Sequence, residues 1–211
     1  MDVHTATVLD RADLGPAVLL RCASIATRDA KPGQYVVIHS DVPNPEKPGQ
    51  VLKRAWSFAR FAADGSFELL FARVAATSGW LAERVPGDTF RFTGPWGRFL
   101  LDEGTSPVAC FATDTAISPV GALVDAALAA GRPVRLWWQT EQDWLPERIV
   151  AWRAAGAVVE VGPDVTPEPD PDARWFLAGD GAAIERMTAL LGSVPAERVH
   201  VERFFTPRPR A

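Results

Sequence analysis

Pro107-Val108-Ala109-Cys110-Phe111-Ala112 is the stretch in which the character of the sequence changes. Its unbroken run of apolar residues is typical of a strand that is buried on both faces of a parallel sheet. From there on, predicted strands alternate with predicted helices, which indicates an α/β domain. The helices are expected over 119–130, 145–155 and 182–191, and the further strands over 134–138, 157–161, 175–178 and 198–201.

The residues before this stretch predict antiparallel β structure. Short alternating or apolar segments are separated by Gly, Pro and Asp turns, a pattern typical of a sandwich or a barrel. The predicted strands cover 3–9, 17–22, 34–38, 67–74 and 89–92. A single helix is predicted from Ser78 to Arg84, with Ser78 as the residue that caps its first turn.

Composition excludes several classes of function. The 211 residues carry 22 Lys and Arg against 26 Asp and Glu, a net charge of −4, so the chain has no global attraction for nucleic acid. Two cysteines exclude a disulfide framework, a four-cysteine iron–sulfur cluster and a cysteine-rich zinc site, and the three histidines share no metal-ligand spacing. No apolar run approaches the roughly 20 residues of a membrane span, and the N-terminus lacks a secretory pattern. We expect a cytoplasmic protein without a metal site.

Three short motifs stand in the β half and at its end. Arg54-Ala55-Trp56-Ser57 follows a proline-rich turn and precedes a predicted strand. Thr77-Ser78-Gly79-Trp80-Leu81 opens the predicted helix, where unpaired N–H groups and the positive dipole end suit a phosphate. Gly94-Pro95-Trp96-Gly97-Arg98-Phe99 is expected to be a turn. Taken singly, each has a purely structural alternative: an exposed arginine beside a core tryptophan, a capped helix and a turn.

Taken in order and spacing, these motifs resemble the ferredoxin–NADP reductase superfamily. The resemblance continues with Thr113-Asp114-Thr115-Ala116-Ile117-Ser118-Pro119, where the family has Thr-Gly-Thr-Gly-Ile-Ala-Pro, and with Ala178-Gly179-Asp180-Gly181, where it has Cys-Gly-Pro-Pro. Val199 to Phe204 is similar to the closing strand and its Glu-x-aromatic ending. The resemblance covers about residues 5 to 205. It implies an N-terminal antiparallel Greek-key β-barrel that binds FAD, residues 1–103, followed by a small parallel α/β domain of NAD(P)-binding type, residues 104–211.

The resemblance also implies roles for residues of the β half. Arg54 would pair with the FAD pyrophosphate, because a guanidinium fork matches phosphate oxygens. Trp56 would pack on the isoalloxazine, and Ser57 would donate a hydrogen bond near flavin N5, which makes Ser57 a catalytic candidate. The backbone at Thr77 and Ser78 would hold the pyrophosphate. The remaining cofactor-binding candidates in these two motifs are Ala55, Gly79 and Trp80.

In the α/β half, the resemblance assigns Thr113 and Asp114 to a nucleotide loop and Glu202 to a second catalytic position. Phe204 or Phe205 could cover the flavin ring, and core packing is the alternative. Several residues of this half differ from the motifs of the family. Asp114 and Ala116 replace the two loop glycines that let the backbone approach a phosphate closely. Ala178 replaces a cysteine, Trp138-Gln139-Thr140-Glu141 lacks the arginine that often meets the extra phosphate of NADP, and a proline-rich loop over 162–173 replaces a helical crossover.

Two functions follow as hypotheses. The first is an FAD-dependent oxidoreductase of ferredoxin reductase type, which moves electrons between NAD(P)H and a partner protein or a small acceptor. The second is a flavoprotein or assembly subunit that keeps the fold without nicotinamide turnover. Arg54 to Phe61 and Asp114-Thr115-Ala116 also resemble the related siderophore-interacting reductases. The sequence does not identify the acceptor, the oligomeric state, or whether NADH, NADPH or neither is used.

Overall fold

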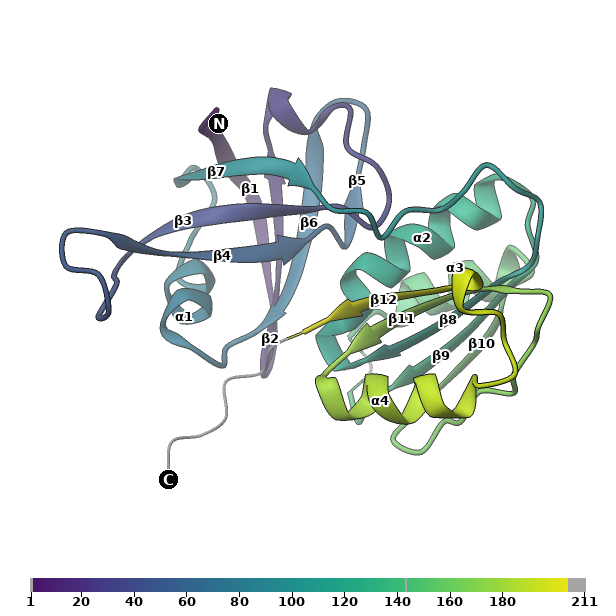
Figure 1. Ribbon diagram of the computed structural model, residues 1–211. Helices are drawn as coiled ribbons and strands as arrows, with labels where there is room; N and C mark the ends of the chain where they lie inside the picture. Colours follow the sequence, from purple (N-terminus) through teal and green to yellow (C-terminus); the bar gives the residue numbers. More distant parts are fainter. Residues whose placement is uncertain (1, 143, 205–211) are drawn as a thin grey trace. The chain divides into compact units, whose positions relative to one another are not determined.

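The computed structural model describes residues 2–142 and 144–204. The chain divides into two units, one that ends at Arg98 and one that begins at Phe99. The first holds a seven-stranded sheet and the second a five-stranded sheet, both shown in Figure 1. The predicted fold class, antiparallel β followed by parallel α/β, is therefore confirmed.

The first unit is an antiparallel sheet with the strand order β4-β3-β7-β1-β2-β6-β5. Its strands alternate between buried apolar and exposed side chains, as a sheet with one face on the core requires. The core joins residues from every long strand, with Phe67, Phe90 and Phe92 among them. The strands are β1 (His4–Leu14), β2 (Ala17–Ala23), β3 (Tyr35–Pro43), β4 (Val51–Ser57), β5 (Arg60–Phe61), β6 (Ser66–Ala72) and β7 (Thr89–Trp96).

One helix, α1 (Ala76–Ala82), packs near β3 and β4 of this unit. Its start differs from the prediction, because Ser78 is the third helical residue and not the cap. The Ser78 hydroxyl accepts hydrogen bonds from the backbone N–H groups of Val74 and Ala75, at 3.0 and 2.9 Å. Ser78 therefore fixes the turn that enters the helix, as the third residue of a capping box does.

Two other motifs also lie in regular strands. Arg54 to Ser57 is the last part of β4 rather than a segment before a strand. Gly94 to Trp96 ends β7 rather than forming a turn, since Tyr35 of β3 still pairs with Trp96. Pairing with a neighbouring strand decided the structure of these short segments, and their local strand or turn propensities did not.

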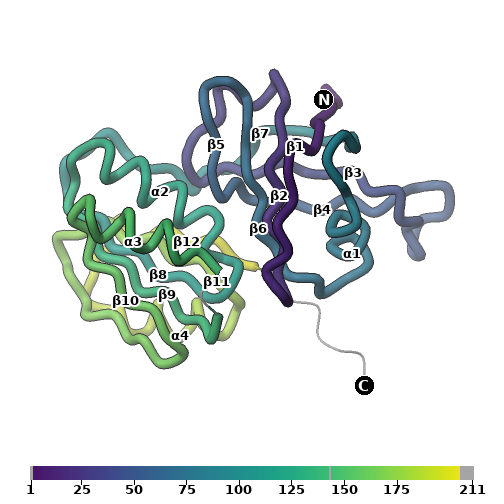
Figure 2. Tube along the Cα trace, turned by 180° about the vertical axis from the view of Figure 1, so that it is seen from behind, coloured from purple at the N-terminus to yellow at the C-terminus, as the bar shows by residue number. Residues whose placement is uncertain are grey.

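The second unit is a parallel sheet with the strand order β10-β9-β8-β11-β12. Figures 1 and 2 show α2 and α3 on one face of this sheet and α4 on the other. The strands are β8 (Val108–Thr113), β9 (Val134–Gln139), β10 (Val158–Gly162), β11 (Arg174–Gly179) and β12 (Val199–Arg203). The helices are α2 (Ile117–Ala129), α3 (Pro146–Ala154) and α4 (Gly181–Leu190), with short 3-10 turns at Ile25–Thr27, Asp114–Ala116 and Ala196–Arg198.

Polar contacts tie the amino-terminal edge of the second sheet to the segment that enters the unit. Arg132 is 5% exposed and donates to both the backbone and the carboxylate of Asp102, and Arg174 pairs with the other carboxylate oxygen at 2.8 Å. Phe99 packs edge-on against Phe176. These contacts explain why the second unit begins at Phe99.

Candidate functional site

Strand β4 carries the Arg-x-aromatic-Ser motif and sets the directions of its side chains. Because side chains alternate along a strand, Arg54 and Trp56 share one face, and Ala55 and Ser57 share the other. Trp56 lies opposite Val36 of β3 and packs edge-on against Phe71, with ring centroids 4.9 Å apart. It stays partly exposed, so part of its indole surface remains open to a ligand.

Arg54 and Ser57 have unused hydrogen-bonding capacity. Arg54 is exposed, and within the described residues its guanidinium makes a single hydrogen bond, to the Lys53 carbonyl at 3.3 Å. The Ser57 hydroxyl is half-buried and forms no side-chain hydrogen bond with any described residue. A planar cation with five donors and a free hydroxyl, beside an indole, are groups that can bind a phosphate and an aromatic ring.

The residues at the start of α1 are held by the fold. Thr77 and Ser78 are buried, at 6% and 2% exposed, while Gly79 and Trp80 are partly exposed. A Cβ added at Gly79 would meet no heavy atom within 4 Å. Glycine inside a helix costs about 1 kcal/mol relative to alanine, so packing within the protein gives no reason for glycine here. Close approach of a ligand would give one.

The carboxyl ends of β8, β9 and β11 gather acidic groups in the second unit. Asp114 follows β8, Glu141 follows β9 and Asp180 follows β11. Burial raises the pKa of the Asp114 carboxyl group; a hydrogen bond from Thr140 opposes this, and the charges of Asp180 and Glu141 add to it. In open parallel sheets this edge is where ligands bind, and here its potential opposes an anion.

The backbone at this edge is also tightly fixed. Asp114 has a φ of 43°, the left-handed region that glycine adopts most easily, and Trp138 Nε1 donates to its carbonyl at 2.9 Å. A Cβ at Gly179 would lie 2.8 Å from Thr113 Oγ1, so only glycine allows this approach of β11 to β8. Asp180 uses its own carboxylate to cap α4 through Ala183 N–H. The first turn of α4 thus already has an anionic partner.

Glu202 and Phe204 lie at the end of the last strand. Glu202 is half-buried opposite Ala178, and burial raises the pKa of its carboxyl group. The N–H of Phe204 bonds to the Gly179 carbonyl at 2.8 Å, and its side chain is partly exposed. Phe205 lies outside the described residues. Glu202, Phe204, Thr113 and Asp114 thus gather at one edge of the second unit, while the other predicted site residues belong to the first.

Sequence reasoning did not single out one group of polar residues. His39, Asp41 and Arg91 line a pocket of the first unit together with Trp80. They come from β3 and β7 and are far apart in the sequence, so spacing gave no signal. Within the described residues, no three His, Cys, Asp or Glu side chains are grouped as metal ligands would be. No helix of the described chain is both long and apolar enough to cross a membrane.

Comparison with known proteins gives a consistent set of neighbours. No protein-family model matches the chain. Ferredoxin–NADP reductase B of Sorangium cellulosum is 40% identical over 95 residues, which are 43% of this chain and 38% of that protein. The toluate 1,2-dioxygenase electron transfer component of Pseudomonas putida is 28% identical over 132 residues, 60% of this chain and 37% of that protein. The chain therefore spans less than two fifths of the length of these curated relatives.

Among solved structures, the FAD/NAD-binding domain of nitric oxide dioxygenase from Vibrio cholerae superimposes with a TM-score of 0.85. The match covers 97% of this chain and 99% of that domain at 18% sequence identity. An identity this low shows the shared fold alone. Together, these neighbours confirm the resemblance that the motifs indicated.

Proposed function

We propose that this chain, which belongs to the ferredoxin–NADP reductase superfamily by its fold and its sequence neighbours, is an FAD-binding electron-transfer reductase. The observation that carries the proposal is the end of β4. There an exposed arginine without an ion pair among the described residues, a partly open indole and a free hydroxyl stand within four consecutive residues, Arg54 to Ser57.

Each of these residues has a defined part in holding the cofactor. Arg54 would pair with the pyrophosphate, and the backbone at Thr77 and Ser78 would contribute further donors. Trp56 would pack on the ring system, and the Ser57 hydroxyl would donate a hydrogen bond to it. Bound FAD supplies the redox chemistry, and the protein supplies placement and electrostatics.

The acidic edge of the second sheet disfavours tight binding of nicotinamide nucleotides. A dinucleotide would bring two negative charges of its pyrophosphate to the sheet edge where the charges of Glu141 and Asp180 already act unfavourably on Asp114. Asp180 also occupies the first turn of α4 with its carboxylate. We therefore propose that NADH and NADPH bind poorly.

A second candidate function rests on the same edge. If nicotinamide turnover is lost altogether, the chain is a partner-dependent flavoprotein that receives its electrons by another route. The Pseudomonas putida relative is named as the electron transfer component of a dioxygenase, and we propose a redox partner of this kind, an oxygenase or a small electron carrier.

Anaerobic mixing distinguishes these functions. The FAD-loaded protein is mixed with NADH or NADPH, and bleaching of the flavin absorption band is followed in time. The reductase function predicts reduction that saturates only at high nucleotide concentration. No reduction at any concentration supports the partner-dependent flavoprotein, and rapid bleaching at micromolar nucleotide contradicts the proposed weak binding.

A further inference from the structure

Three basic side chains form a row across the sheet of the first unit. His39 of β3 lies directly opposite Lys53 of β4 on one side and Arg91 of β7 on the other, and Thr5 of β1 continues the row opposite Arg91. Side chains directly opposite one another in antiparallel strands have Cβ atoms about 4.5–5.5 Å apart, and like charges placed so are destabilising.

None of these three basic groups has a protein partner among residues 2–142 and 144–204. The structure gives no ion pair or side-chain hydrogen bond for Lys53, His39 or Arg91 in those ranges. His39 is only 8% exposed. Among the described residues, the ring nitrogens of His39 are not counted with the buried side-chain atoms that lack a partner, so they reach the pocket, where a ligand can accept a hydrogen bond from the ring.

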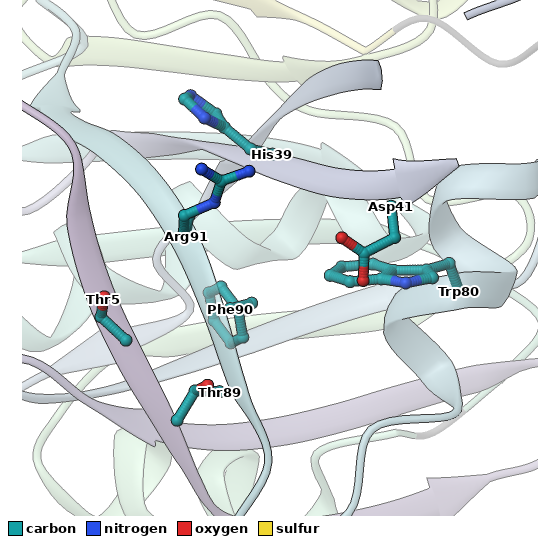
Figure 3. A pocket seen from close by; sticks show the side chains of 7 residues that line it. All are labelled: Thr5, His39, Asp41, Trp80, Thr89, Phe90 and Arg91. Carbon is teal, nitrogen blue, oxygen red and sulfur yellow. The ribbon is translucent and has the colours of Figure 1, made fainter. Parts of the chain in front are cut away.

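The row borders a pocket. His39 and Arg91 line a cavity of about 230 Å³ together with Thr5, Thr89, Phe90, Trp80 and Asp41. In Figure 3, the side chains of His39 and Arg91 lie next to each other, and the Asp41 carboxylate lies beside the Trp80 indole. The volume is below the roughly 300–1,000 Å³ of pockets for drug-sized ligands, so the pocket fits a small ligand.

We propose that this pocket is an anion site that binds a phosphate group, either as inorganic phosphate or as the phosphate of a small monoester. Arg91 supplies a guanidinium fork, His39 donates at least one ring N–H, and Lys53 adds a positive charge from the neighbouring strand. The Thr5 and Thr89 hydroxyls offer neutral donors at the same lining.

The groups around His39 determine in which direction bound phosphate shifts its pKa. Burial lowers the pKa of His39, and the positive charges of Lys53 and Arg91 lower it further. Asp41 is exposed and is the carboxylate in the pocket lining. A bound phosphate would favour the imidazolium form of His39, and Asp41 would oppose the anion.

The basic row is separate from Arg54 and Trp56, although Trp80, another cofactor-binding candidate, also lines the pocket. Lys53 and His39 share the face of the sheet opposite to that of Arg54 and Trp56, because Arg54 pairs with Ile38 and Trp56 with Val36 in the alternate positions. Phosphate binding at this pocket can therefore be tested without flavin reduction.

The test is a phosphate titration of the full chain, read from the ring signals of its three histidines by NMR at constant ionic strength. We expect the His39 signals to shift saturably and the apparent pKa of His39 to rise, while His4 and His200 serve as internal references. A titration with 5′-AMP separates the two sources of the phosphate: tighter binding than inorganic phosphate identifies a monoester.

Variants sharpen the test. Arg91→Gln should weaken phosphate binding at least about ten-fold, since it removes a hydrogen bond to a charged group. Asp41→Asn should tighten it, and Lys47→Gln, in the exposed β3–β4 loop, should change nothing. Absence of a saturable His39 shift in the wild-type chain overturns the proposal, as does equal affinity in Arg91→Gln. The proposal is also overturned if an acidic protein shifts the His39 signals and phosphate does not.

Discussion

Replacing Asp114 with asparagine isolates the charge that we hold responsible for weak nucleotide binding. Asparagine tolerates the left-handed φ of 43° as well as aspartate does, and it keeps a side-chain oxygen that can accept a hydrogen bond. The substitution therefore removes the carboxylate charge with little disturbance of the loop.

The size of the effect follows from Coulomb's law. Two unit charges 4 Å apart interact by about 1 kcal/mol in water and about 4 kcal/mol at the effective dielectric of a protein surface. The residue as a whole is exposed, although its carboxyl group is buried enough for its pKa to rise, so we take the lower, solvent-screened figure. It corresponds to an increase of about five-fold in affinity for NADH.

The assay is the nucleotide concentration that half-saturates anaerobic flavin reduction. Asp172→Asn is the matched control, because it removes the same charge from the exposed loop before β11, at the other end of the strands. We expect Asp114→Asn to lower the half-saturating concentration of NADH about five-fold and the control to leave it unchanged. Equal values in both variants would refute the placement of Asp114 at the nucleotide site.

The same variant predicts a pH dependence of stability. The pKa of Asp114 is higher in the folded than in the unfolded chain, so folding is favoured below 3.8 and this advantage is lost as the pH rises through the folded value. Asp114→Asn should therefore be more stable than the wild type at pH 7. Thermal melts should show this difference shrinking as the pH falls through the folded pKa and vanishing below 3.8. A difference independent of pH would contradict the electrostatic cause.

Three further predictions follow. Gly79→Ala should stabilise the FAD-free protein by about 1 kcal/mol in thermal melts and weaken FAD binding, because the new Cβ enters open space beside α1; unchanged FAD affinity would show that the ligand stays away from this residue. Asp102→Asn should lower the free energy of unfolding at pH 7 by about 1–3 kcal/mol. Burial raises the pKa of Asp102, but Arg132 and Arg174 outweigh this and lower it below 3.8 in the folded chain. The wild type therefore loses this stabilisation as the pH falls from 3.8 through the folded pKa, and the variant should show a smaller loss of stability in acid. Trp152→Phe should lower the free energy of unfolding, measured with urea, by about 2 kcal/mol, because Trp152 Nε1 of α3 donates to Asp125 of α2 at 2.6 Å. A loss below about 0.5 kcal/mol, the usual scatter for surface substitutions, would show that this hydrogen bond contributes little.

Much of the fold was predictable because its patterns are local. The apolar run from Pro107 to Ala112 became β8, the central strand of the second sheet, and Gly131 closes α2 with a φ of 69° where the sequence predicted the end of a helix. The five tryptophans outside the motifs are all buried in the second unit, where Trp137 and Trp175 stack 12° from parallel. Packing therefore accounts for them.

What the sequence left open depends on pairing between distant strands. No local pattern extends β7 through Gly94 to Trp96, because the extension depends on Tyr35. The row of Lys53, His39 and Arg91 likewise exists only through the registers of three strands. The roles of Ser57, Glu202 and the other predicted site residues remain predictions, since they concern bound molecules.

Titration of the flavin-free protein with FAD tests whether the end of β4 binds the cofactor. Quenching of flavin fluorescence is measured for the wild type, for Arg54→Gln and for Arg21→Gln, a control at an exposed position of β2. We expect the wild type and the control to bind FAD alike. Arg54→Gln should bind at least about ten-fold more weakly, because it loses charge-assisted hydrogen bonds to phosphate. Failure of the wild type to take up FAD, or equal affinity in Arg54→Gln, would contradict FAD binding at the end of β4.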